Sequence, residues 1–426
     1  MMKSKYIWVF MVVIGFALIS SNGITVQAED YSYLVDQPPQ FYELPGLNKK
    51  GNALIEWTSM TDPSLDGVGT IYYEVQVAKN TSFTDAKQYI TQESALTLST
   101  SDFGKNGGKF HVRVCRIVDF VDETTPDLMS PWAEAEEMIF VKINKTNFPG
   151  LYNVLKKGGQ YSSPNGVAKI DFDQNDDGWL DPLEIRDIWI LGTITETKKV
   201  NGKYKTTKAT NISSFKGIEY FTRLSSVSIA RYSGKTANLS ESPAKSVWIR
   251  GITAKQFTIN APNAINVLVE ADYGTKMTQL DVSRCKNAVD LTVYGNDGTK
   301  KLKLPKSKKN LRVLSLSEIG TKSLNMNEYI NLQQVYFYEC EATSIKVNKC
   351  KNLRYIYFYY CDNIKSLNLK SNKKLRGADF YKTPGLTKST VKRPKNGKYT
   401  WNTGKWWYKT AAYKKDMEKI SKIGYN

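Results

Sequence analysis

The stretch LQQVYFYECEATSIKVNKCKNLRYIYFYYC, residues 332–361, contains one short pattern twice. Leu332 begins L-x-x-V-x-F, and Leu353 begins L-x-x-I-x-F. Apolar residues that alternate with other residues are typical of a half-buried β-strand. A second, shorter apolar pair, Ile345 and Val347, lies between the two strands. Each repeat therefore has two strand-like arcs.

The pattern recurs through the second half of the chain, with a period of about 22 residues. It starts at Leu224, Ala244, Ala264, Ala288, Leu311, Leu332, Leu353 and Leu375. Such a period is typical of a solenoid, in which each repeat buries its apolar face by stacking on its neighbours. We therefore expect a solenoid of about eight coils over residues 205–391.

Cysteine and asparagine recur at one position, separated by two residues from the apolar pair of an arc. The residues there are Cys285, Asn296, Cys340, Cys350, Cys361 and Asn372. An inward side chain of this kind can hydrogen-bond the turning backbone, whose buried polar groups need partners. The prediction is a structural ladder of buried thiols and amides. Disulfides or a metal cluster are the alternative, although five cysteines suit a disulfide framework poorly.

A different motif, DQNDDGWLDPLE, occupies residues 173–184. It fills every position of D-x-[DN]-x-[DN]-G-x5-E, a loop whose alternate residues direct oxygen ligands at calcium. The expected ligands are Asp173, Asn175, Asp177, the backbone carbonyl of Trp179, Asp181 and Glu184. The alternative is an acidic turn that caps a helix at residues 182–189.

Only one such loop is present, whereas calcium sensors usually pair two of them. We therefore expect a structural calcium ion that rigidifies the hinge between the two halves of the chain. Extracellular sites of this type bind calcium at roughly 0.1–1 mM, which keeps them saturated outside a cell.

The first 143 residues have their own organisation. Residues 1–28 combine a basic start, an apolar run and a small-residue cleavage site, which together predict a secretory signal peptide. The mature protein is then extracellular, secreted or associated with the cell surface, with no integral membrane segment after cleavage. Residues 37–143 contain short alternating stretches separated by polar turns, which predict an antiparallel β-sandwich. The predicted fold class is thus mainly β.

Two parts of the chain resemble known families. The order of Trp57, YEVQVAKNTSF, FHVRV and SPW resembles a fibronectin type III domain. The short repeats with an Asn/Cys ladder resemble internalin-type leucine-rich repeats. The segment SSFKGIEYFTRLSSVSI, residues 213–229, is similar to the first repeat of secreted leucine-rich-repeat proteins of Gram-positive gut bacteria.

In those proteins an EF-hand-type calcium loop typically lies just upstream of the repeats, which implies such a loop and helix within residues 150–190 here. The repeats that start at 224, 244 and 264 depart from the family, because they lack Asn or Cys at the ladder position.

Charge is distributed unevenly. The net charge is +19, but residues 201–426 hold 42 Lys+Arg against 15 Asp+Glu, whereas the first 200 hold 18 against 26. A basic body attracts polyanions through its summed field. For an exported protein we expect an anionic wall polymer and no nucleic acid. The second arc would supply Lys301, Lys303, Lys346 and Lys370.

Tyrosines mark the expected ligand face of the solenoid. The outward positions of the later coils carry Tyr336, Tyr338, Tyr355, Tyr357, Tyr359 and Tyr381. Tyrosine combines a large apolar area with a hydroxyl group, which suits a glycan or protein ligand. The expected function is an adhesin-like surface or secreted binding protein. The alternative is a wall-associated structural protein held electrostatically by teichoic acid, and a secreted hydrolase is a third possibility.

We do not expect an enzyme. His111 is the single histidine, so a zinc site with two histidines is excluded. SGKT, residues 233–236, lacks the first glycine of a phosphate-binding loop. The aromatic and basic segment 392–426 is predicted to cap the solenoid, with a wall-binding tail as the alternative.

Overall fold

The computed structural model describes residues 30–43, 45–163, 166–193, 195–200, 203–296, 298–395, 400–401, 414–415 and 418–419. The predicted signal peptide and most of the predicted C-terminal cap or tail lie outside these residues. The fold is mainly β, and helices α1 (Tyr152–Lys157) and α2 (Pro182–Asp187) have six residues each. In the described part of the chain, no helix has the length and apolar character needed to cross a membrane.

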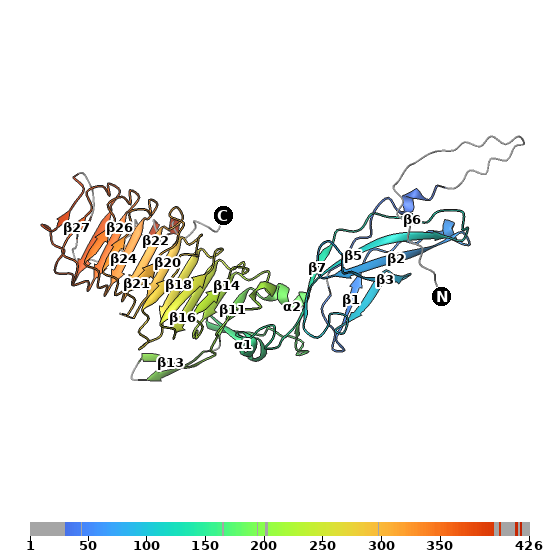
Figure 1. The fold of residues 1–426 in the computed structure, drawn as a ribbon, viewed down its shortest axis with the longest axis horizontal. Helices are drawn as coiled ribbons and strands as arrows, with labels where there is room; N and C mark the ends of the chain where they lie inside the picture. Colours follow the sequence, from blue (N-terminus) through green and yellow to red (C-terminus); the bar gives the residue numbers. More distant parts are fainter. Residues whose placement is uncertain are drawn as a thin grey trace, which may run out of the picture.

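A ten-stranded parallel sheet, the wide sheet, forms one side of the solenoid (Figure 1). Its strands are, in spatial order, β11 (Ile190–Gly192), β14 (Ser226–Ile229), β16 (Ser246–Ile252), β18 (Asn266–Ala271), β20 (Asp290–Tyr294), β22 (Val313–Ser317), β24 (Gln334–Tyr338), β26 (Tyr355–Tyr359), β28 (Gly377–Tyr381) and β30 (Thr400–Trp401). Neighbouring strands pair in register, as Phe337 does with Phe358. The repeat pattern therefore gives a solenoid of about eight coils, each of about 22 residues.

The second arc of each coil forms shorter parallel sheets on the opposite side. They are β15 (Thr236–Asn238), β17 (Gln256–Asn260), β19 (Gln279–Asp281) and β21 (Lys301–Lys303); β23 (Ser323–Asn325) with β25 (Ser344–Lys346); and β27 (Leu367–Asn368) with β29 (Val391–Lys392). One apolar cluster fills the space between the two sides. It includes Leu316, Phe337, Ile356 and Phe358, each with no exposed surface. The stack therefore supplies a core that one coil could not form alone.

The N-terminal region, residues 30–143, is antiparallel. One sheet pairs β1 (Asn52–Glu56) with β4 (Ala95–Ser99). The other contains β2 (Gly69–Ala78), β3 (Lys87–Thr91), β5 (Gly107–Phe120), β6 (Leu128–Met129), β7 (Glu136–Lys142) and β10 (Trp179–Leu180). Residues of both sheets, among them Ile55, Leu98 and Val112, belong to one apolar cluster.

The junction, residues 144–189, connects the two regions (Figure 1). It contains α1, α2 and the two residues of β10, which pair with β7 through Trp179↔Lys142 and Leu180↔Val141. The junction also contains a hairpin of β8 (Gly159–Ser163) with β9 (Gly166–Ile170). A second hairpin, β12 (Thr195–Val200) with β13 (Lys203–Ala209), follows the junction in the chain.

Candidate functional site

The acidic loop, residues 173–184, folds back on its own backbone. Both carboxylate oxygens of Asp173 accept a backbone N–H, one from Asp177 and one from Gly178, each at 3.0 Å. Asn175 Oδ1 accepts from the same Asp177 N–H, also at 3.0 Å. Gly178 has a φ of +79°, which residues with a side chain rarely adopt. Glycine at the sixth position therefore permits the turn that the motif requires.

The end of the loop starts helix α2. The Asp181 side chain accepts from the backbone N–H groups of Leu183 at 2.9 Å and Glu184 at 3.0 Å, and Glu184 Oε2 accepts from the Asp181 N–H at 3.3 Å. This reciprocal arrangement is a capping box. Glu184 Oε1 also accepts from the Gln174 N–H at 2.6 Å and so closes the loop. Helix α2 ends at Asp187, two residues before the predicted end.

The loop concentrates negative charge in a partly buried place. Burial, followed by the charge of Asp181, raises the pKa of Glu184 to about 8. Burial also raises the pKa of Asp173 and of Asp177, although backbone hydrogen bonds oppose the rise. Among the described residues, no ion pair involves the carboxylates of the loop. A bound cation would offset this mutual repulsion.

The donor chemistry of the loop fits calcium. All the expected ligands are oxygens, which a hard cation of loose coordination geometry accepts. Their present arrangement is nevertheless that of a hydrogen-bonded turn. Among the described residues, no group of three or more His, Cys, Asp or Glu side chains lies close enough together to hold a metal ion. The loop also lines a cleft of about 910 Å³ whose other residues include Lys156, Lys157 and Lys169.

Two adjacent residues of the loop enter two different cores. Trp179 is 8% exposed and belongs to the N-terminal cluster, whereas Leu180 is fully buried in the solenoid cluster. Side chains alternate between the two faces of a strand, so β10 directs one residue into each core. Asp181 Oδ2 accepts from the Leu47 N–H at 2.7 Å and ties the loop to the start of the N-terminal region. The loop therefore joins the two halves.

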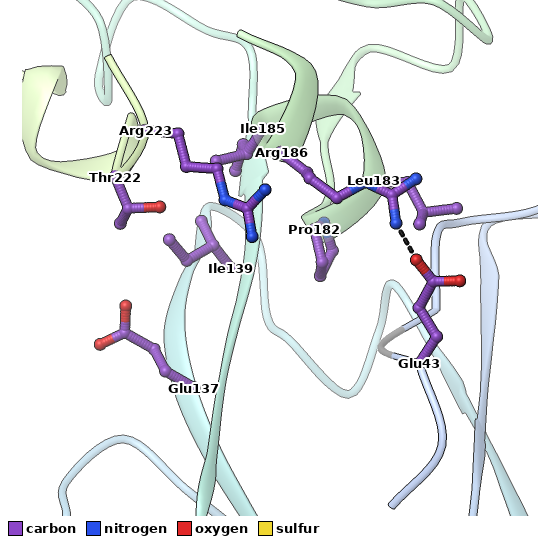
Figure 2. A pocket seen from close by; sticks show the side chains of 9 residues that line it. All are labelled: Glu43, Glu137, Ile139, Pro182, Leu183, Ile185, Arg186, Thr222 and Arg223. Atoms are coloured by element: carbon purple, nitrogen blue, oxygen red, sulfur yellow. Dashed lines mark hydrogen bonds and ion pairs between the residues drawn. The ribbon is translucent and has the colours of Figure 1, made fainter. Parts of the chain in front are cut away.

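A small cavity lies beside this connection. Figure 2 shows its lining, which comes from the N-terminal region, α2 and the first coil: Glu43, Glu137, Ile139, Pro182, Leu183, Ile185, Arg186, Thr222 and Arg223. Its volume is about 280 Å³, and two of its lining residues, Glu43 and Arg186, form an ion pair at one side of it. Two acids and two arginines line the cavity, so their formal charges balance, and the sequence had given no sign of this arrangement.

The predicted tyrosines share the outer face of the wide sheet. Register places Tyr338, Tyr359 and Tyr381 in one row, and Tyr336 beside Tyr357 in another. Ring centroids lie 5.4 Å apart for Tyr336 and Tyr359, and 5.8 Å apart for Tyr359 and Tyr381. We call these residues, together with Tyr355, the tyrosine face.

Exposure differs sharply within the tyrosine face. Tyr381 is 43% exposed, whereas Tyr355 and Tyr357 are each only 3% exposed. These two lie on the outer side of β26 but form an apolar cluster of their own, packed against Tyr336 and Tyr359. Alternation correctly indicated the face on which they lie, but it did not reveal their burial.

Acidic residues on the same outer face were not singled out from the sequence. Asp379 is 6% exposed, follows Tyr357 in register and accepts from the Tyr359 hydroxyl at 2.9 Å. Burial raises its pKa, and burial raises the pKa of Asp290, on β20, to about 6. Both residues occupy outward positions of the repeat, so the alternation that identified the tyrosines would have found them.

The cysteines and asparagines form two ladders, because they follow strands of two different arcs. Asn296, Cys340 and Cys361 follow the wide sheet, whereas Cys285, Cys350 and Asn372 follow the shorter sheets. The single position expected from the sequence is therefore two positions, one in each arc. All five cysteines of the chain are buried and free of disulfide bonds.

Side chains in both ladders donate to the preceding coil. Cys340 Sγ donates to the Leu316 carbonyl at 3.2 Å, and Cys350 Sγ donates to the Met326 carbonyl at 3.1 Å. Asn372 Nδ2 donates to the Val347 and Cys350 carbonyls, both at 2.9 Å. Burial raises the pKa of Cys350 to about 12, which makes this thiol a poor nucleophile.

The lysines expected on the second arc are exposed. Lys303 pairs with Asp281 at 3.0 Å, which partly cancels its charge. Lys301 and Lys346 lie on the shorter sheets, and Lys370 follows β27 in the next turn.

In sequence comparisons, no protein-family model matches this chain and no curated protein matches it.

Proposed function

We propose that the protein is an exported binding protein whose tyrosine face takes a glycan or protein ligand and whose acidic loop holds a structural calcium ion. In this proposal the coils are of the leucine-rich-repeat type, the loop is of the EF-hand type and the N-terminal region is a fibronectin type III-like spacer. The observation that carries the ligand proposal is the contiguous array of tyrosine rings across β24, β26 and β28.

The array offers contact area at a low entropic cost. A tyrosine loses few rotamers on binding and presents both an apolar ring and a hydroxyl group. Buried Tyr355 and Tyr357 support the neighbouring rings, and exposed Tyr381 with half-buried Tyr338 provides the surface that a ligand can contact. Ring stacking and hydroxyl hydrogen bonds suit sugar rings, which have both apolar faces and polar edges.

The ligand proposal is tested with immobilised purified mucin as the probe. We expect the full chain to bind saturably and the double variant Tyr338→Ala/Tyr381→Ala to bind at least tenfold more weakly, as when contacts at the centre of an interface are lost. The matched control is Tyr273→Ala, which removes a ring that is 97% exposed and lies in the turn after β18. Equal affinity of the double variant and the wild type would remove the tyrosine face from the proposal.

Calcium would act at the junction. Asp173, Asn175, Asp177, Asp181 and Glu184 would hold it with side-chain oxygens, and Trp179 with its carbonyl. The bound ion would supply positive charge to carboxylates whose pKa is raised in its absence. Because Trp179 and Leu180 enter two cores, a rigid loop would fix the two halves relative to each other.

Calorimetric titration of calcium tests the loop. We expect one site with a Kd of roughly 0.1–1 mM, abolished in Asp173→Asn/Glu184→Gln. The control is Asp176→Asn, which changes an exposed carboxylate that the motif does not use, at a φ of 59° that asparagine tolerates. Proteolysis between residues 150 and 215 should be faster in chelator. Identical cleavage with and without chelator would contradict the proposed role at the hinge.

A further inference from the structure

The two long edges of the solenoid differ in charge. We call basic edge the turns that lead from a shorter strand into the next strand of the wide sheet, residues 282–289, 304–312, 326–333, 347–354 and 369–376. We call mixed edge the turns that lead from the wide sheet into a shorter strand, among them residues 298–300, 318–322, 339–343, 360–366 and 382–390. The sequence had indicated a basic second half, but it had not separated these edges.

Exposed cations are concentrated on the basic edge. They are Arg284, Lys286, Lys306, Lys309, Lys349, Lys351, Lys370, Lys373, Lys374 and Arg376. The single acid in these five turns is Glu328, which pairs with Lys308 at 3.3 Å. The mixed edge, by contrast, carries acids in three successive turns, Glu318, Glu339 with Glu341, and Asp362, and Lys322 pairs with Glu341 at 2.9 Å. Only the basic edge therefore presents a continuous surface of one sign.

Four lysines on the basic edge form a line. Lys286, Lys351 and Lys373 each come one residue after the side chain that the turn buries. Lys309 occupies the equivalent place in its coil, after half-buried Lys308. Exposed Ile330 occupies this place in the remaining coil. Neighbouring coils are about 4.8 Å apart, so the line is roughly 19 Å long. Among the described residues, no ion pair involves these four lysines.

Asparagines fix the backbone beneath this line. Asn310 Nδ2 donates to the Lys286 carbonyl at 3.0 Å, and Asn331 Nδ2 donates to the Lys309 carbonyl at 2.9 Å. Asn352 Nδ2 continues the series to the Ile330 carbonyl at 3.2 Å. The turns are thus held in register before any partner binds, which lowers the entropic cost of aligning several charges with one ligand.

We propose that the basic edge binds a linear polyphosphodiester of the poly(glycerol phosphate) type, lying along the solenoid axis across successive coils. A row of cations at a short, regular spacing matches repeated anionic groups on a flexible chain better than one compact anion. The edge carries no exposed aromatic ring, since Tyr329 is 2% exposed. Single-stranded nucleic acid is therefore disfavoured, because its bases stack on aromatic side chains. The same absence disfavours ligands that bind through sugar rings.

This surface is separate from the tyrosine face, and it identifies the residues that would hold an anionic wall polymer. This proposal depends on the proposed function in one respect only: an exported protein would meet a cell-wall polymer of this kind. The lysines expected from the sequence for this role lie mostly on the shorter sheets, whereas the basic edge has the denser and less neutralised charge.

The test is binding of the full chain to purified poly(glycerol phosphate), measured by calorimetry at several salt concentrations. The edge variant is Lys286→Gln/Lys309→Gln/Lys351→Gln/Lys373→Gln. The matched control removes four exposed lysines outside the basic edge: Lys300→Gln/Lys322→Gln/Lys365→Gln/Lys382→Gln. Both variants lose the same net charge. Circular dichroism and thermal melts check that both remain folded.

We expect the edge variant to bind at least tenfold more weakly and the control to stay within about threefold. Four lost phosphate contacts should also reduce the slope of log K against log salt by about 3. Equal weakening in the two variants would overturn the proposal, because net charge alone would then explain binding, and so would an absence of binding by the wild type. Polymer binding that survives Tyr338→Ala/Tyr381→Ala would separate this surface from the tyrosine face.

Discussion

The solenoid and the junction hold together in opposite ways. In the solenoid each contact recurs from coil to coil, as Phe337, Phe358 and Phe380 do in consecutive strands. At the junction each contact occurs once, through Trp179 in one core and Leu180 in the other. When one side chain of the solenoid is removed, the equivalent contacts in the other coils remain. A contact that is lost at the junction has no equivalent elsewhere. We therefore expect damage of equal size to have different consequences in the two regions.

The largest expected effect is from removing a large buried ring in each region. Trp179→Ala and Phe358→Ala should each lower the free energy of unfolding by about 3–5 kcal/mol, from lost burial and the cavity left behind. Only Trp179→Ala should also speed proteolysis between residues 144 and 189 under native conditions. Denaturant titration and timed digestion measure the two quantities. Equal acceleration in both variants would contradict the distinction between a repeated and a single contact.

A smaller effect is expected from the ladder. Asn372→Ala removes the side-chain donor to two buried carbonyls, each of which keeps one backbone N–H donor. The two lost hydrogen bonds should cost about 1–3 kcal/mol of unfolding free energy. Asn363→Ala, at an exposed position in the preceding turn, is the control and should change little. If both variants unfold at the wild-type denaturant concentration, the ladder contributes no net stability.

The outer face of the solenoid should show a pH dependence. Burial raises the pKa of Asp290 to about 6 from an ordinary 3.8, so the folded state favours the protonated carboxyl. Ionisation of the Asp290 carboxyl then lowers the free energy of unfolding. This loss is nearly absent below about pH 4 and is complete above about pH 7. Asp290→Asn should therefore nearly match the wild type at pH 4 and be more stable by up to about 3 kcal/mol at pH 7. A constant difference across this range would show that the carboxyl does not titrate as described.

The smallest expected effect is at the junction cavity. The ion pair between Glu43 and Arg186 is exposed on both sides, with side chains 73% and 39% accessible. Such pairs contribute about 0–1 kcal/mol, so Glu43→Gln should shift the thermal midpoint by no more than a few degrees. A larger loss would mean that the junction depends on this pair and not mainly on Trp179 and Leu180.

The sequence predicted the repeated part of the fold better than its ends. The apolar pattern located the strands of the wide sheet from β14 to β28, because an eightfold recurrence is hard to produce by chance. It missed β11 and β30, which extend the wide sheet without the full pattern. It also could not show that Ile139 and Val141, on a strand of the N-terminal region, belong to the solenoid core. Contacts between distant segments leave no periodic signal.

The candidate functional residues could likewise be predicted only where they form a local or repeated pattern in the sequence. The acidic loop was singled out because its expected ligands are close together in sequence, and the tyrosine face because alternation fixes the side of a strand. The burial of Tyr355 and Tyr357 could not be predicted, since alternation shows direction and not what packs above it. The basic edge required the coils to be superposed before Lys286 and Lys373 could be seen as members of one line.

The alternation at β10 restricts how the length of this protein can change during evolution. One residue inserted before Trp179 within the loop would exchange the faces of Trp179 and Leu180, so that each would meet the wrong core. A whole coil added to the middle of the solenoid would leave both residues where they are. Related chains should therefore differ in length by multiples of one coil, while the spacing from Asp173 to Glu184 stays constant.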